Sequence, residues 1–342
     1  MTTHLSSPSQ YLDLLSKYDT WMFDCDGVLW NDDHLIDGAI EVLKLLRTHQ
    51  KQILFVTNNA SKSRKTYKKK FDQLGVEAHV DEIFGSAYAA AVYISSVLKL
   101  PKDQKVYVIG MNGLEEELAE EGVAYLGGTD PADNTLSFTP SSVFSPDPSV
   151  SAVLCGLDLS LNYTKLSKAF TYLHTLGPKC HFIATNLDST YPAKGGILPG
   201  AGAVMAGLRV ASGREPVCVG KPEATMLECI KAKHDFNPER TIMVGDRLNT
   251  DILFGQRGGL ATLLVLSGIT HLEEVAGPNP SPIVPTYYTN SLGDLRAAGG
   301  SQNGSKIGNG FVVNGNGHAL NGNGHALNGN GHVLNGNGHV LN

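Results

Sequence analysis

The stretch "WMFDCDGVLW", residues 21–30, places two carboxylates, Asp24 and Asp26, at the end of an apolar run. Burying one unpaired carboxylate is costly, and a second one beside it adds repulsion between like charges. Residues two apart in a strand point to the same side, so the two acids would converge where a strand leaves the core. Either the pair forms a solvated turn, or a cation makes the arrangement favourable.

The chain around this stretch alternates between apolar runs and helix-like segments nearly to residue 297. Runs such as "ILFVT", "KVYVIG", "HFIATN" and "TIMVGD" are separated by segments with helical spacing of apolar residues, such as "GAIEVLKLLRTHQ". Near-continuous apolar strands that alternate with helices predict a parallel sheet covered on both faces. We therefore expect an α/β protein with a doubly wound parallel sheet.

The bulk composition narrows the class of protein. The chain has 342 residues, of which 42% are hydrophobic, and this length suits roughly two domains. A formal net charge of −6 argues against nucleic acid or an anionic membrane as a partner. No apolar run approaches the ~18 residues of a membrane span, and the N-terminus does not resemble a secretory signal. Five scattered cysteines without C-x-x-C spacing favour free thiols in a reducing compartment, so a cytoplasmic protein is expected.

The tail from Gly299 differs from the rest of the chain. It contains four copies of a seven-residue unit, "NGNGHAL" twice and then "NGNGHVL" twice, beginning at Asn314. Asn-Gly repeats lose much backbone entropy on ordering and bury little apolar area, so we predict that residues 299–342 are disordered. The repeat histidines could bind a transition metal weakly, but a solvated spacer is the favoured interpretation.

Two more apolar runs end in residues that suit phosphate chemistry. Thr57, Asn58 and Asn59 follow "ILFV", and a hydroxyl with its following backbone N–H groups could cradle phosphate oxygens. Lys221 follows "VCVG", where its compact positive charge could serve a phosphoryl group or a carboxylate nucleophile. Taken singly, these residues also fit the start of an ordinary loop and a surface lysine.

The fourth run, "TIMVG", is followed by Asp246 and, five residues later, by Asp251. Asp246 could complete an oxygen-rich Mg²⁺ site with Asp24. Asp251, on the first turn of the next helix, could orient that site or could simply cap the helix. Open α/β sheets bind ligands at the carboxyl ends of their strands, so four such strand ends together favour one catalytic phosphate site over four separate turns.

With these motifs in place, the chain resembles the haloacid dehalogenase superfamily of phosphatases from about residue 18 to about residue 295. The stretches "FDCDGVLW", "VTNNASKSR", "ATNLDSTYP", "PGAGA", "GKP" and "MVGDRLNTDILFG" are similar to its 4-nitrophenylphosphatase and phosphoglycolate phosphatase branch, and most to the fungal members. The resemblance implies a Rossmann-like core with a large inserted α/β cap domain. We expect the core at residues 1–100 and 214–298, with the cap at 101–213 between them.

The resemblance also implies catalytic roles. Asp24 would attack phosphorus to give an aspartyl-phosphate. Asp26 would protonate the leaving alkoxide and then activate the hydrolytic water. Mg²⁺ would be held by the Asp24 carboxylate, the Asp26 backbone carbonyl and the Asp246 carboxylate, with Asp251 orienting this inner shell.

The phosphate oxygens would be held by residues of the other two motifs: Thr57, Asn58, Asn59 and Lys221. The expected reaction is Mg²⁺-dependent hydrolysis of small phosphate monoesters, with 4-nitrophenyl phosphate as a laboratory substrate and 2-phosphoglycolate and related metabolites in the cell. The alternative is a protein or pyridoxal phosphate phosphatase of the same superfamily. A catalytically dead binding protein is disfavoured, because a binder needs no nucleophile.

Substrate choice in this branch lies largely in the cap, whose loop at residues 185–196 should reach over the site. By alignment with the family motif, Tyr191 occupies the selectivity position, where relatives that prefer pyridoxal phosphate have a histidine. A tyrosine would close the pocket over a small substrate, or it only packs the cap. Asn186 and Asp188 either shape this loop or touch the substrate. Members of this branch commonly dimerise through the cap, so a homodimer is expected by resemblance.

Two features stay outside this scheme. Cys25 should point away from the metal as a packed thiol, with a redox role as the alternative. The basic stretch "KSRKTYKKK", residues 62–70, is predicted to lie mostly on a solvated helix face, with docking of a phosphoprotein as the alternative.

Overall fold

The computed structural model describes residues 2–135, 145–193, 196–299, 312–313 and 319–320. The chain divides into two units, Met1–Ala298 and Gly299–Asn342. In the second unit, the described residues form one antiparallel pair, β17 (Val312–Val313) with β18 (Ala319–Leu320). The rest of the tail, including all four repeat histidines, lies outside the described residues, and its predicted disorder stays a prediction.

Seven parallel strands build the first sheet, in the order β1-β16-β15-β14-β2-β5-β6. The chain winds outward from β2 through β5 to β6 on one side, and from β14 through β15 to β16 on the other. The order therefore reverses between β2 and β14, and ligands of open α/β sheets bind at such a switch point. The strands are β1 (Thr3–His4), β2 (Thr20–Phe23), β5 (Gln52–Thr57), β6 (Ile83–Gly85), β14 (Thr241–Gly245), β15 (Ala261–Val265) and β16 (Tyr287–Thr289).

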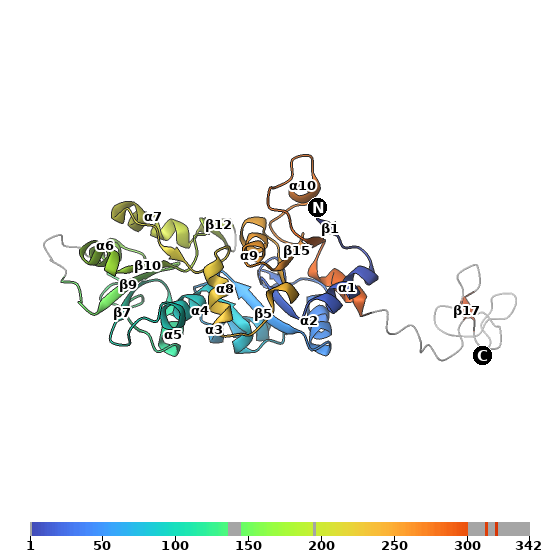
Figure 1. The fold of residues 1–342 in the computed structure, drawn as a ribbon, viewed down its shortest axis with the longest axis horizontal. Helices are drawn as coiled ribbons and strands as arrows, with labels where there is room; N and C mark the ends of the chain where they lie inside the picture. Colours follow the sequence, from blue (N-terminus) through green and yellow to red (C-terminus); the bar gives the residue numbers. More distant parts are fainter. Residues whose placement is uncertain (1, 136–144, 194–195, 300–311, 314–318, 321–342) are drawn as a thin grey trace, which may run out of the picture. The chain divides into compact units, whose positions relative to one another are not determined.

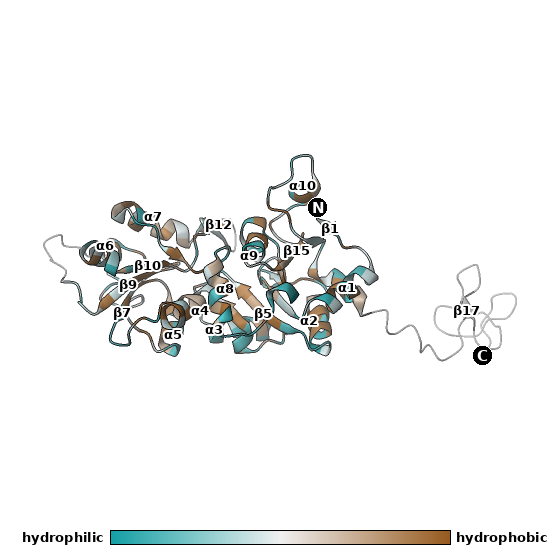
Figure 2. Cartoon of the chain, in the orientation of Figure 1, coloured by the Kyte–Doolittle hydropathy of each residue, from teal (hydrophilic) through white to brown (hydrophobic). Residues whose placement is uncertain are grey.

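Helices cover both faces of this sheet (Figure 1). Successive strand residues alternate in direction, so Trp21 and Phe23 of β2 join one hydrophobic cluster and Met22 joins another. Figure 2 shows a hydrophobic β5 beside a largely hydrophilic α3. The first cluster packs against α1 (Pro8–Lys17), α2 (Ala39–Thr48) and α3 (Arg64–Gln73), and the second against α4 (Ser86–Val92), α8 (Ala224–Lys231) and α9 (Leu253–Arg257).

A second, five-stranded parallel sheet follows the order β13-β10-β9-β7-β8. The cluster around Met22 continues into it through Val106 and Ile183, so one hydrophobic cluster joins the two sheets. Its strands are β7 (Lys105–Ile109), β8 (Ala124–Gly127), β9 (Val150–Cys155), β10 (His181–Ala184) and β13 (Val217–Cys218), and its helices are α5 (Asn112–Glu120), α6 (Tyr163–Leu176) and α7 (Ala201–Ser212).

The predicted α/β class, with a doubly wound parallel sheet and a second α/β layer inserted in it, is confirmed. β13 pairs with β10, so the second sheet extends to residue 218, beyond the predicted end of the cap at residue 213. Short β hairpins complete the unit: β3 (Trp30–Asn31) with β4 (His34–Leu35), and β11 (Thr190–Ala193) with β12 (Gly196–Pro199). Among the described residues, no helix has the length and apolar character needed to cross a membrane.

Candidate active site

Asp24 begins the turn that leaves β2 at the switch point. Its backbone N–H still donates to the carbonyl of Val244 in β14 at 2.9 Å, so the residue is fixed to the sheet edge. Gly27 then takes a φ of 82°, in the left-handed region that favours glycine. A Cβ at Gly27 would lie 2.4 Å from Oδ2 of Asp246, so the turn passes directly over that carboxylate.

Asp246 and Asp251 reach the same point from the end of β14. Oxygens of Asp24, Asp246 and Asp251 all lie within 4.8 Å of one another. Asp251 is fully buried, and its Oδ2 accepts from the backbone N–H of Arg247 at 3.1 Å. The structure thus brings together the three acids that follow β2 and β14, and Asp251 lies in the cluster itself.

Lys221 lies in the middle of this acidic cluster. Its ammonium donates to Asp251 Oδ1 at 2.6 Å and to the carbonyl of Val56 at 2.8 Å, and it pairs with Asp24 Oδ1 at 3.0 Å. All three of its N–H groups therefore have protein acceptors. Burial alone lowers the pKa of Lys221, but Asp24 and Asp251 together raise it above its ordinary value. The lysine is charged, and it holds the carboxylate predicted to be the nucleophile.

The cluster carries unbalanced negative charge. Three carboxylates against one ammonium leave a formal charge of −2. Burial and repulsion from the neighbouring carboxylates raise the pKa of Asp24 well above its ordinary value, although Lys221 opposes the shift. Burial, followed by the charge of Asp251, raises the pKa of Asp246 to about 7. A divalent cation with oxygen ligands would relieve this repulsion.

Thr57 and the two asparagines lie beside the cluster at the end of β5. The Thr57 hydroxyl accepts from the backbone N–H of Asn59 at 3.2 Å. The Asn58 amide donates to the carbonyl of Lys221 at 3.0 Å, and its Oδ1 accepts from the backbone N–H of Lys221 at 2.8 Å. The Asn59 side chain accepts from Ser61 in its own loop. Both asparagine side chains are thus engaged in holding loops, and Asn58 fixes the segment that carries Lys221.

With this geometry in place, comparison with known proteins identifies the family. The model described as haloacid dehalogenase-like hydrolase matches residues 21–124, and a second, HAD-hydrolase-like model matches residues 218–295. The 4-nitrophenylphosphatase of Schizosaccharomyces pombe is 46% identical over 297 residues, which cover 86% of this chain and 99% of that protein. The chain belongs to the haloacid dehalogenase-like hydrolases.

Two further relatives of this haloacid dehalogenase-like hydrolase support the assignment. Phosphoglycolate phosphatase 2 of Arabidopsis thaliana is 43% identical over 297 residues, 86% of this chain and 98% of that protein. The crystal structure of 4-nitrophenylphosphatase from Thermotoga maritima matches with a TM-score of 0.69 and 28% identity, over 83% of this chain and 98% of that one. The predicted superfamily is confirmed, and the chain is a phosphatase of that superfamily.

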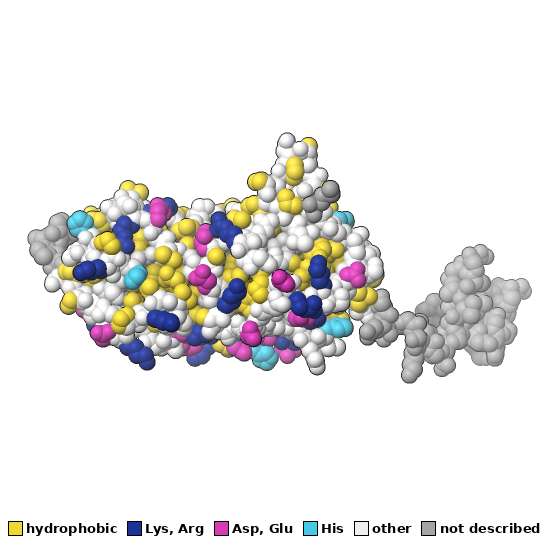
Figure 3. Space-filling model, viewed as in Figure 1, with side chains coloured by type: hydrophobic (Ala, Val, Ile, Leu, Met, Phe, Trp, Pro, Cys, Tyr) yellow, Lys and Arg dark blue, Asp and Glu magenta, His cyan; other side chains and the backbone are white. Residues whose placement is uncertain are grey.

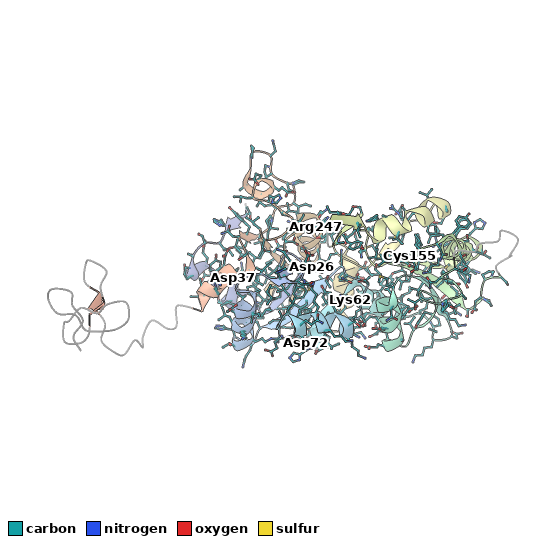
Figure 4. The ribbon with its side chains drawn as sticks, turned by 180° about the vertical axis from the view of Figure 1, so that it is seen from behind. Asp26, Asp37, Lys62, Asp72, Cys155 and Arg247 are labelled. Carbon is teal, nitrogen blue, oxygen red and sulfur yellow. The ribbon has the colours of Figure 1, made fainter. Side chains whose placement is uncertain are left out.

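In this phosphatase, the predicted proton donor Asp26 lies apart from the buried cluster. Its side chain is 48% exposed, and its Oδ1 accepts from the indole N–H of Trp30 at 2.9 Å. The ammonium of Lys70 lies 3.6 Å from the same oxygen. Figure 4 labels Asp26 together with Lys62 and Arg247 close to the junction of the two sheets. Sequence reasoning did not identify Trp30 or Lys70 as site residues.

Helical spacing was the signal that could have found Lys70. The residue lies three positions after Tyr67 in α3, so it shares a face with a buried ring. The prediction that most lysines of this stretch are solvated agrees with the exposed Lys65 and Lys69. Arg64 of the same helix pairs with Glu117 of α5 at 2.9 Å. Lys70 is an exception among these lysines, because it faces Asp26.

The loop before β11 docks the second sheet onto the core. The Asn186 amide donates to the carbonyl of Asn58 at 2.9 Å, and Asp188 Oδ2 accepts from the Asn58 amide at 3.2 Å. Burial raises the pKa of Asp188, while the bond from Asn58 opposes the shift. Of the two predicted roles for Asn186 and Asp188, these bonds support shaping of the loop.

Tyr191 lies on the β11–β12 hairpin, paired with Leu198, and its side chain is half-buried. Within the described residues, no hydrogen bond joins it to the acidic cluster, so its role in selectivity stays a prediction. Cys25 is fully buried in the first hydrophobic cluster, as predicted for a packed thiol, and burial raises its pKa.

The loop after β15 is a part of the site that sequence reasoning missed. The backbone N–H of Ile269 donates to Asp246 Oδ2 at 2.8 Å, and the Ser267 hydroxyl donates to the carbonyl of Gly27 at 2.7 Å. This loop therefore fixes both the Asp246 carboxylate and the turn after Asp26. It continues into α10 (Glu273–Ala276), whose segment exposes hydrophobic side chains (Figure 3).

Proposed function

We propose that the chain is a Mg²⁺-dependent hydrolase of small phosphate monoesters that works through an aspartyl-phosphate on Asp24. The observation that carries the proposal is the pairing of Asp24 with Lys221 at 3.0 Å inside a cluster of excess negative charge. A binding protein gains nothing from such an arrangement, because repulsion among buried carboxylates lowers its stability. An enzyme that needs a metal and a carboxylate nucleophile does gain from this arrangement.

The donor atoms fit Mg²⁺. The clustered side chains offer only carboxylate oxygens, which Mg²⁺ prefers, and the formal charge of −2 matches a divalent ion. Asp24 and Asp246 would hold the ion together with the backbone carbonyl of Asp26. Asp251 already bonds Lys221 and the Arg247 backbone, so we assign it to orienting these groups. When bound, Mg²⁺ would offset the repulsion between an anionic nucleophile and an anionic phosphate.

The remaining steps belong to the chain itself. The Asp24 carboxylate attacks phosphorus, and the ester P–O bond breaks as the leaving oxygen takes a proton from Asp26. Asp26 then takes a proton from the water that hydrolyses the aspartyl-phosphate, which releases inorganic phosphate and regenerates both acids. Lys221 keeps Asp24 oriented and supplies positive charge beside the phosphate. The Thr57 hydroxyl and the backbone N–H groups after it would hold phosphate oxygens together with Asn59, whereas the Asn58 amide already donates to Asp188 and to the Lys221 carbonyl.

The substrate class follows from the cap. The loop that docks on Asn58 lies next to the cluster, which favours small phosphate esters, such as aryl phosphates and 2-phosphoglycolate, over a phosphoprotein. We infer that Tyr191 contributes to this choice. The five buried free cysteines support a reducing, cytoplasmic location. Exposed apolar residues of the inserted region, such as Ile197 of β12 and Val210 of α7, support a homodimer through the cap.

A panel assay tests the proposal. Hydrolysis of 4-nitrophenyl phosphate, 2-phosphoglycolate, glycerol 3-phosphate, pyridoxal phosphate and a phosphopeptide is ranked by kcat/KM with MgCl2 and with EDTA. We expect activity that EDTA abolishes, with small phosphoesters ranked above the phosphopeptide. Activity that persists in EDTA would reject the metal assignment, and a phosphopeptide at the top of the ranking would reject the substrate class.

A further inference from the structure

The carboxylate of Asp26 is held by two residues that lie outside the phosphate-binding motifs. Its Oδ1 accepts from the Trp30 indole N–H at 2.9 Å, and the Lys70 ammonium lies 3.6 Å from the same atom. Within the described residues, Oδ2 makes no hydrogen bond or ion pair. One oxygen of Asp26 is therefore anchored while the other is left for the reaction.

Trp30 is a rigid anchor. It is fully buried and meets the ring of Phe71 edge to face, with 4.9 Å between the ring centroids. The turn brings it back to Asp26, because the backbone N–H of Gly27 donates to the carbonyl of Trp30 at 2.8 Å. The indole N–H is thus aimed at Asp26 by both packing and backbone bonds.

Lys70 lies over the same ring. Its ammonium lies 4.7 Å from the centroid of Trp30, within the range of a cation–π contact, and its side chain is 19% exposed. Its neighbour Lys69 is exposed, and no ion pair or hydrogen bond of its side chain occurs among the described residues. Lys70 therefore differs from the solvated lysines of α3, since the ring of Trp30 and the carboxylate of Asp26 hold its ammonium in place.

We propose that Lys70 and Trp30 are positioning residues that hold the Asp26 carboxyl toward the leaving group. The inference rests on the proposed phosphatase reaction, in which the proton on Asp26 passes to the ester oxygen as its bond to phosphorus breaks and the bonding pair stays on that oxygen. A carboxyl free to rotate delivers this proton less often, so catalysis suffers most where the leaving group needs it most.

The test compares substrates that carry the same phosphate group and differ in the leaving group. The substrates are 4-nitrophenyl, phenyl and glycerol phosphate, whose leaving anions become progressively less stable without a proton. Lys70→Met keeps the length of the side chain and removes its charge and N–H groups. We expect kcat/KM to fall less than about 3-fold for 4-nitrophenyl phosphate and at least about 10-fold for glycerol phosphate, with phenyl phosphate between them.

Three further variants complete the design. Lys70→Arg restores a cation over the ring and should return the glycerol phosphate value to within about 3-fold of wild type. Lys69→Met, on the exposed face of the same helix, should match wild type with all three substrates. Trp30→Phe keeps a ring but removes the N–H, and should reproduce the graded loss. If circular dichroism shows that Lys70→Met does not fold, Trp30→Phe decides whether the positioning role holds.

The outcomes separate this inference from the proposed function. A wild-type chain inactive on all three esters with MgCl2 would reject the phosphatase proposal itself. An active wild type whose Lys70→Met variant loses the same factor with every ester would show that Lys70 acts through general electrostatics or packing. Either that result, or a Lys70→Met variant with unchanged kcat/KM on all three esters, would overturn the positioning role and leave the phosphatase proposal intact.

Discussion

The raised pKa of Asp246 makes the stability of the metal-free protein depend on pH. Burial and the charge of Asp251 raise this pKa from 3.8 to about 7. Between these values the native state holds a proton that the unfolded chain has released, so the free energy of unfolding falls as pH rises through about 7. A difference of about 3 units at about 1.36 kcal/mol each sets an upper limit of about 4 kcal/mol.

Mg²⁺ takes the place of that proton, so it should stabilise the protein more at high pH. We expect the Tm increase on replacing EDTA with millimolar MgCl2 to be several degrees larger at about pH 8.5 than at about pH 5.5. Asp246→Asn removes one of the titrating groups and should reduce the pH slope and lose most of the Mg²⁺ effect, while Asp24, whose pKa is also raised, still titrates. The exposed Asp33→Asn is the matched control and should behave as wild type. Differential scanning calorimetry provides the measurement, and equal Mg²⁺ increments at both pH values would refute the reasoning.

Two more substitutions, one with a matched control, probe the turn and the cap. Gly27→Ala should abolish Mg²⁺-dependent activity, because its Cβ would lie 2.4 Å from Asp246 Oδ2. Gly75→Ala has a similar φ of 71° but no atom within 4 Å, so it should lose only the roughly 1 kcal/mol of left-handed strain and keep full kcat; equal activity losses would show that the clash is irrelevant. Tyr191→His should change the order of kcat/KM among small phosphoesters, and an unchanged order would remove Tyr191 from substrate selection.

Much of the site could be predicted from the sequence because its residues lie at the ends of strands. Alternating apolar runs and helices imply a parallel sheet, and the carboxyl ends of such strands meet at one edge. That logic brought Asp24, Thr57 and Asp246 together correctly. It also placed Lys221 in this site, although Lys221 follows β13 of the second sheet rather than a strand of the first. Which sheet a two-residue strand joins depends on its tertiary neighbours, and no local pattern encodes them.

The environment of Asp26 was beyond sequence reasoning for a related reason. Trp30 reaches Asp26 through a tight turn, and Lys70 reaches it from a helix forty residues further along. The basic composition of that helix suggested solvation, and only the packing of its inner face separates Lys70 from Lys69. The loop at Ile269 is similar, because its contact with Asp246 is made by a backbone N–H that any residue could supply.

The most direct test of the central claim is to trap the phosphoryl group on Asp24. Wild-type protein mixed with MgCl2 and a phosphoester labelled in the phosphoryl group is quenched in acid within the first turnover, digested and sequenced by mass spectrometry. We expect label on the peptide that contains residues 21–30, located at Asp24, and no labelled peptide from Asp24→Asn, whose kcat should fall by at least about 10³-fold. Label on another residue, or an Asp24→Asn variant with comparable turnover, would contradict the aspartyl-phosphate mechanism.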